Sequence, residues 1–152
     1  YELVLTAQKS AIDAISPGKT LADLNKLVNE ILTKGLIELG ILSGELTQLI
    51  EDKAVKKYFM HGLGHWLGLD VHDVGDYQVD ENRKQLRAFE PGMVMTIEPG
   101  LYFSPSDKSI EQKWRGVGVR IEDNILVTKD GYENLTVNVP KERQAIEQLM
   151  TK

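Results

Sequence analysis

The chain of 152 residues contains no cysteine. Disulfides and thiolate metal sites are therefore excluded, and any metal ion would have to be held by His, Asp or Glu. No apolar run approaches the ~20 residues needed to span a bilayer, and the N-terminus lacks the basic and apolar blocks of a signal peptide. We therefore expect no membrane partner, and the lack of cysteine suits a cytoplasmic protein.

An excess of basic residues is also missing. The chain has 18 Lys and Arg against 23 Asp and Glu, which gives a net charge of -5, and its basic residues are scattered along the sequence. Nucleic-acid binding normally requires a clustered positive surface, so we expect no nucleic-acid partner. The length and the hydrophobic content of 41% predict one folded unit with a real core.

Apolar residues at spacings of three and four predict amphipathic helices, whose stripes we interpret as core packing rather than as cofactor sites. Thr20 and Asp23 resemble a capping box with Asp in place of Glu. The predicted helices lie at residues 3–15, at residues 20–40, after Ser43 and after Pro140.

Alternating apolar and polar residues predict strands at residues 93–98 and 117–127, with a continuation at 101–103 and a return strand at 132–139. Polar segments at 76–89 and 104–113 read as exposed loops. The pattern indicates an α+β fold, with helices packed on one side of a mainly antiparallel sheet.

All three histidines, His61, His65 and His72, lie within residues 59–75. His61 and His65 are four apart, but the zinc motif with this spacing has a glutamate between its histidines, and here position 62 is glycine. Glycines at 62, 64 and 68 would each cost a helix roughly 1 kcal/mol, so we expect extended or irregular backbone. Such glycines also allow the backbone to approach a ligand or a neighbouring chain closely.

Glu98 and Glu122 each fall on a predicted strand with strongly apolar neighbours. We therefore expect each carboxylate to point into a partly enclosed space. Two buried carboxylates near each other are unfavourable unless cations compensate their charge. A centre for Mn, Co, Zn or Fe is one explanation, and bridging carboxylates commonly hold two ions. Neutralisation of Glu122 by Arg120, without any metal, is the other, and spacing leaves both open.

Three motifs carry a family resemblance: residues 61–75 (HGLGHWLGLDVHDVG), residues 90–102 (EPGMVMTIEPGLY) and residues 118–123 (GVRIED). In this order they resemble the bacterial Xaa-Pro aminopeptidases, in the proline-peptidase branch of the pita-bread metallopeptidases. The resemblance implies a pita-bread fold, of which residues 1–152 form the C-terminal portion of one catalytic domain. The N-terminal domain and the hairpin that carries two further metal-binding aspartates would lie outside this chain.

The resemblance also implies a catalytic centre. His65, Glu98 and Glu122 would be ligands of two divalent metal ions, most often Mn²⁺. A hydroxide bridging these ions would attack the bond between an N-terminal residue and a following proline. Glu98 would handle the proton, and His72 and His61 would hydrogen-bond the substrate.

Other residues would support this centre. Arg120 would orient the carboxylates. Trp66 and Tyr102 would line a proline pocket, unless they serve only as aromatic core packing. The expected partners are peptides with proline in the second position, and the full-length enzyme is expected to be a cytoplasmic homo-oligomer.

Two other functions fit the same motifs. Prolidases resemble this chain in the same motifs but accept only dipeptides. A metal-free pita-bread module that binds peptides or proteins is the non-enzymatic alternative, and the presence of His65, Glu98 and Glu122 argues against it. Because two ligands of the family are absent, we expect the isolated chain to bind metal weakly and to be inactive.

Overall fold

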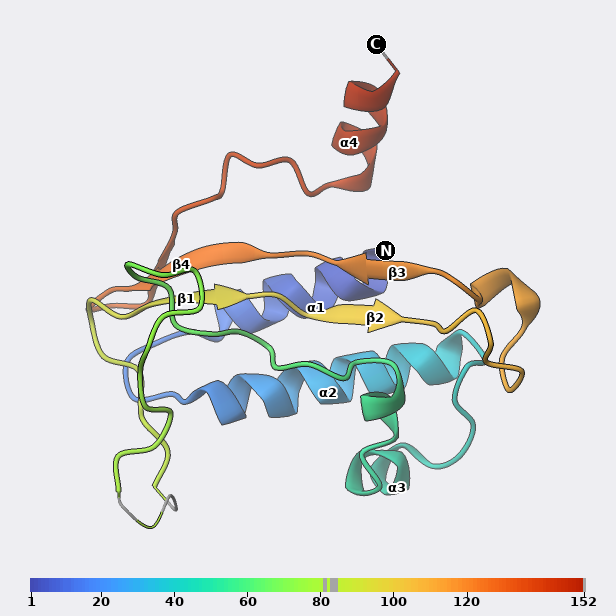
Figure 1. Ribbon diagram of the computed structural model, residues 1–152, viewed down its shortest axis with the longest axis horizontal. Helices are drawn as coiled ribbons and strands as arrows, with labels where there is room; N and C mark the ends of the chain where they lie inside the picture. The colour runs from blue at the N-terminus through green and yellow to red at the C-terminus, as the bar shows by residue number, and fades with distance from the viewer. Residues whose placement is uncertain (81, 83–84, 152) are drawn as a thin grey trace.

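The computed structural model describes residues 1–80, 82 and 85–151. Helices α1 (Glu2–Asp13) and α2 (Leu21–Glu38) lie alongside a set of antiparallel strands (Figure 1). This arrangement confirms the predicted α+β class. None of the helices among the described residues is long and apolar enough to cross a membrane.

The N-terminal helices form where their sequence predicts. The Thr20 side chain accepts a hydrogen bond from the Asp23 amide, and the Asp23 carboxylate accepts one from the Thr20 amide, so the capping box is present. α1 and α2 pack closely at Gly35, where a Cβ atom would lie 2.3 Å from the Leu3 side chain. The lack of a side chain at this position allows the close contact. Shorter helices follow at α3 (Leu46–Glu51) and η1 (Ala54–Lys57), and α4 (Arg143–Met150) projects away from the strands (Figure 1).

The strands form two sheets rather than the single sheet expected. β1 (Val94–Ile97), β4 (Asp123–Val127) and β5 (Tyr132–Asn134) form a three-stranded sheet in the order β1-β4-β5. β2 (Gly100–Tyr102) pairs with β3 (Gly118–Arg120). The predicted return strand at 132–139 is also shorter than expected, because turns follow Asn134.

The two strand pairs, β1–β4 and β2–β3, are separated by short interruptions that lie opposite each other on the two chain stretches. Glu98 and Pro99 separate β1 from β2, and Ile121 and Glu122 separate β3 from β4. Pro99 has no N–H to donate, so the only ladder bond here runs from the Ile121 amide to the Pro99 carbonyl oxygen, at 3.3 Å. The prediction of one continuous strand over 117–127 is therefore wrong, because its partner strand carries a proline opposite its centre.

One register nevertheless continues across this interruption. Extending either strand pair places Glu98 opposite Glu122. The Glu98 amide turns to the other side and donates to the Leu63 carbonyl at 2.7 Å. Glu98 and Glu122 thus occupy a non-hydrogen-bonded position, where paired residues are closest, about 4.5 Å between Cα atoms.

The segment that contains the three histidines (residues 59–75, the histidine segment) runs along the free edge of β1 at residues 63–67. Its backbone exchanges three bonds with this strand: the Leu67 amide to Val94, the Thr96 amide to His65 and the Glu98 amide to Leu63. The expectation of extended or irregular backbone is confirmed. The predicted loop at 76–89 is exposed over much of its length, and positions 81, 83 and 84 fall outside the described residues.

Gly64 explains how the segment comes so close to β1. A Cβ atom at this position would lie 1.9 Å from the Thr96 carbonyl oxygen, so only glycine fits without moving the backbone. Gly62 has no comparable constraint, since its Cβ would meet nothing closer than 3.8 Å. One of the two uses proposed for these glycines was close approach to a neighbouring stretch of backbone. Gly64 has this role, because it contacts the backbone of β1 at Thr96.

Candidate metal centre

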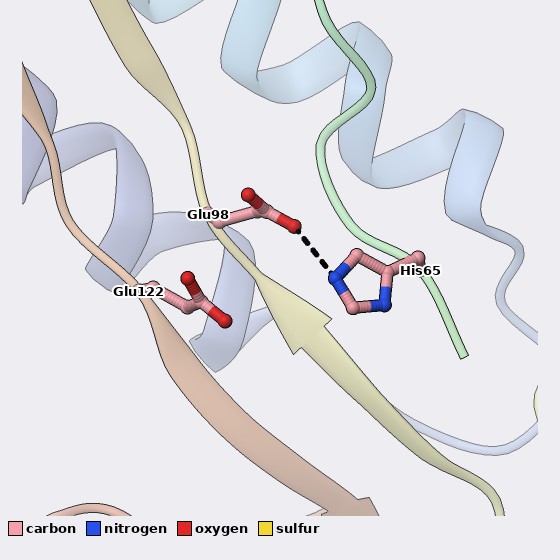
Figure 2. Close-up of side chains that lie close together, drawn as sticks. All are labelled: His65, Glu98 and Glu122. Atoms are coloured by element: carbon pink, nitrogen blue, oxygen red, sulfur yellow. Dashed lines mark ion pairs between the residues drawn. The ribbon is translucent and has the colours of Figure 1, made fainter. Parts of the chain in front are cut away.

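His65, Glu98 and Glu122 converge from three separate stretches of chain (Figure 2). Each offers one ligand atom, and these atoms all lie within 4.8 Å of one another. His65 comes from the segment at the edge of β1, Glu98 follows β1, and Glu122 precedes β4. Strand register and edge pairing therefore bring together residues that are far apart in sequence.

Glu98 is buried at the centre of this group, with 7% of its surface exposed. The Thr96 hydroxyl donates to its Oε1 at 3.0 Å, and the same hydroxyl oxygen accepts from the His65 amide at 3.0 Å. Arg120 Nη1 lies 3.4 Å from the other carboxylate oxygen. Thr96 is a supporting residue that sequence reasoning missed, although its place two residues before Glu98, on the same strand face, was a usable signal.

The hydrogen bonds of His65 indicate a cation site. Its Nδ1 lies 3.0 Å from the Trp66 carbonyl oxygen, which can only accept, so Nδ1 carries the proton. The other nitrogen, Nε2, lies 3.1 Å from Glu98 Oε1. Nε2 therefore faces the Glu98 carboxylate, an arrangement in which an imidazole and a carboxylate can share a metal ion.

Glu122 differs from expectation because its side chain is exposed rather than enclosed. The alternative was that Arg120 neutralises Glu122. In the structure the Arg120 guanidinium instead forms its ion pair with Glu98. Arg120 thus contacts the more buried of the two carboxylates.

The donor set fits a divalent metal ion of the Mn, Co, Zn or Fe type. One imidazole nitrogen and two carboxylates are borderline, oxygen-rich ligands. Two carboxylates directly opposite each other repel unless a cation lies between them. Within the described part of the chain this is the only group of three or more His, Cys, Asp or Glu residues close enough to share an ion.

A hydrogen-bonded chain of side chains leads away from Glu98. Arg120 Nε donates to the Tyr102 hydroxyl oxygen at 2.6 Å, and Tyr102 in turn lies 2.9 Å from His61 Nε2. The hydrogen bond with Tyr102 raises the pKa of Arg120, and the charges of Glu98 and Glu122 add to this effect. The second nitrogen of His61 pairs with the Gly62 carbonyl at 2.8 Å, so both ring nitrogens have partners.

Two glycines allow Tyr102 to reach this position. A Cβ on Gly100 would lie 2.6 Å from the Tyr102 hydroxyl oxygen, and one on Gly118 would lie 3.3 Å from its ring. Gly118 is the cross-strand partner of Tyr102 and Gly100 that of Arg120. The ring therefore lies flat over glycine backbone and points its hydroxyl back toward Arg120.

The remaining predicted site residues separate into two groups. His72 is exposed and packs edge to face on His65, with ring centroids 4.3 Å apart. Trp66 instead stacks on Tyr77, with centroids 5.4 Å apart, and packs against the hydrophobic core. His72 thus borders the group formed by His65, Glu98 and Glu122 (the metal-ligand group). The contacts of Trp66 fit the alternative of aromatic packing.

Asp123 follows Glu122 and faces the opposite side of the strand, because successive side chains alternate along a strand. It is buried, with 1% of its surface exposed, and is bound by Gln8, Thr136 and Lys141, whose Nζ lies 2.8 Å away. Burial alone would raise the pKa of Asp123, but these hydrogen bonds outweigh it and lower the pKa. Asp123 therefore acts as a buried anchor for the C-terminal segment and not as a metal ligand.

Comparison with known proteins identifies the family of this chain. Residues 1–129 match the metallopeptidase family M24. The chain is 52% identical to an Xaa-Pro aminopeptidase of Haemophilus influenzae, over 99% of the chain and 34% of that protein. It therefore spans about a third of the length of the relatives it matches.

Solved structures give the same result. The aminopeptidase PepP of Pseudomonas aeruginosa has a TM-score of 0.94 at 48% identity, over 99% of this chain and 34% of that one. A zinc-substituted aminopeptidase P of Escherichia coli in complex with product has a TM-score of 0.92 at 45% identity, over 99% and 33%. The chain belongs to metallopeptidase family M24.

Proposed function

We propose that residues 1–152 are the C-terminal portion of the catalytic domain of an Xaa-Pro aminopeptidase with a pita-bread fold. The observation that carries this proposal is the convergence of His65, Glu98 and Glu122, whose ligand atoms lie within 4.8 Å of one another. Relatives of this chain named Xaa-Pro aminopeptidase support the substrate class, namely peptides with proline in the second position.

His65, Glu98 and Glu122 would hold part of a centre for two divalent ions, for which we propose Mn²⁺. When bound, such ions activate a water molecule and polarise the scissile carbonyl. Three residues supply too few donors for two ions, so further ligands would come from outside this chain. The zinc-substituted relative indicates that related centres accept more than one metal.

Glu98 is the residue we assign to proton transfer. It is buried and held by Thr96 and Arg120, so its carboxylate is fixed in position. In this position it would take a proton from the attacking water and deliver it to the proline nitrogen as the peptide bond breaks.

Arg120, Tyr102 and His61 would orient this carboxylate and the substrate. The ion pair to Glu98 and the hydrogen bond to Tyr102 fix the Arg120 guanidinium. Because both nitrogens of His61 are already bound, a contact with substrate would require exchange of one of these bonds. His72 is more accessible, and we assign it to hydrogen bonding with the substrate carbonyl oxygen.

Two measurements test the proposal. Calorimetric titration of residues 1–152 with Mn²⁺ should give weak binding without Xaa-Pro cleavage, and tight uptake of two ions with cleavage would contradict the incomplete centre. In the complete enzyme, Glu98→Gln should abolish turnover. Retained turnover would refute the role of Glu98.

Prolidase is the second candidate, because the three motifs are common to both enzymes. The complete enzyme should cleave a longer proline-containing peptide if it is an aminopeptidase, whereas a prolidase would cleave only the dipeptide. A peptide-binding module without metal would bind both and cleave neither. The cytoplasmic location and the homo-oligomeric state of the complete enzyme stay predictions.

A further inference from the structure

An apolar cavity of about 500 Å³ lies at the end of the β2–β3 pair that is remote from Glu98 and Glu122. One edge carries the ion pair between Lys57 Nζ and Asp107 Oδ2, at 2.7 Å. The hydrogen bond from Lys57, followed by those from Ser109, lowers the pKa of Asp107 to about 2, so these charges are engaged with each other. The apolar walls come from Tyr58, Met60, Tyr102, Phe103, Pro105 and Val117.

Part of the cavity wall lies on the face of the strands that carries Glu98 and Glu122, whereas Phe103 and Val117 line it from the opposite face. Side chains alternate along a strand, so Tyr102 shares its face with Glu98, and Gly118 shares its face with Glu122. Tyr102 and Gly118 are paired across the strands and both line the cavity. The face that carries the two carboxylates therefore runs past Arg120 and the Tyr102 ring to the edge of this cavity.

Distance decides which part of a substrate could reach this cavity. Four residues of strand separate Glu98 from Tyr102, which corresponds to about 13 Å. In an aminopeptidase substrate a single residue precedes the cleaved bond and extends only about 3.5 Å. The chain that follows proline has no such limit: in extended form its third, fourth and fifth residues lie roughly 5, 9 and 12 Å beyond the cleaved bond, and their side chains reach further.

We propose that this cavity binds an apolar side chain of the peptide substrate downstream of proline, at the third, fourth or fifth position. The inference rests on the proposed function and deepens it. A dipeptide ends at proline and cannot span the distance, so an occupied cavity selects longer peptides. Its presence thus favours the aminopeptidase over the prolidase.

The test uses the complete enzyme loaded with Mn²⁺ and four pentapeptides. One is Ala-Pro followed by three glycines, and the others carry one leucine in the third, fourth or fifth position. The readout is the ratio of kcat/KM between a leucine peptide and the glycine peptide. Because both values come from one preparation, the fraction of folded enzyme cancels.

We expect one leucine peptide to exceed the glycine peptide about tenfold, a gain typical of burying part of an aliphatic side chain. Val117→Asp and, independently, Met60→Gln should reduce this ratio to below about threefold, because each places a polar group in the apolar wall. Val139→Asp is the matched control, since Val139 is exposed and lies outside this cavity, and it should keep the full ratio.

Either of two results would overturn the inference. One is the absence of any leucine preference in the unmodified enzyme, and the other is a preference that survives both Val117→Asp and Met60→Gln. Failure of the proposed function looks different, because none of the four peptides would then be cleaved. That outcome would overturn both.

Discussion

Replacement of Gly64 by alanine should separate the histidine segment from β1. The new Cβ would lie 1.9 Å from the Thr96 carbonyl oxygen and 2.9 Å from its carbon, both atoms of the backbone. Relief of this clash requires a shift of roughly 1 Å, because close-packed interiors do not tolerate such overlap. Neither atom belongs to a flexible side chain that could turn away.

The magnitude follows from the bonds that this shift breaks. The segment is held near Gly64 by the Thr96 amide to His65 (2.9 Å), the Glu98 amide to Leu63 (2.7 Å) and the His65 amide to Thr96 Oγ1 (3.0 Å). At about 1 kcal/mol net for each bond, Gly64→Ala should cost about 3 kcal/mol of folding free energy. A domain of this size should then lose roughly 6–12 °C in Tm.

Gly62→Ala is the matched control. Its Cβ would meet nothing closer than 3.8 Å, and its backbone is not left-handed, so stability should change by less than about 0.5 kcal/mol. Urea unfolding of both variants and of the unmodified protein measures the difference. Equal stability of the two variants would refute the assignment of Gly64 to close backbone contact.

Two further predictions concern the groups on either side of the strand pair. Asp123→Asn should cost about 3 kcal/mol at neutral pH, because Lys141 loses its buried partner. Since the pKa of Asp123 is lower when folded than the unfolded value of about 3.9, its stabilisation is present above that pH and is lost as pH falls through the folded pKa; urea unfolding should therefore show the two proteins converging in acid, and a constant difference would contradict this. Tyr102→Phe in the complete enzyme should lower kcat about 10- to 100-fold by removing the hydroxyl shared by Arg120 and His61; an unchanged kcat in steady-state assays would show that this hydroxyl is dispensable.

Local sequence signals predicted the elements whose determinants are short in range. The Thr20 and Asp23 capping box and the apolar stripe of α2 needed only neighbouring residues. Strand alternation likewise placed Glu98 and Glu122 on predicted strands beside strongly apolar neighbours. The assignment of His65, Glu98 and Glu122 to one metal centre, in contrast, came from the family resemblance.

What could not be predicted depends on pairing between distant segments. The interruption at Glu122 is caused by Pro99 on the partner strand, so the alternation of 117–127 alone gave no sign of it. The ion pair between Arg120 and Glu98 also could not be predicted, because it depends on the register between two strands. The orientation of Trp66 depends on Tyr77, which lies beyond an irregular loop.

The two strand pairs share one register, so the alignment of Glu98 with Glu122 depends on the number of residues in each paired stretch. Deletion of Pro99, between β1 and β2, would put the two strand pairs out of phase, so that Glu98 and Tyr102 would no longer share a face. Insertions at 104–111 lie outside the paired strands and would leave the two glutamates aligned. Length should therefore be tightly restricted from 94 to 102 and from 118 to 127 in functional variants, and free in the loop between them.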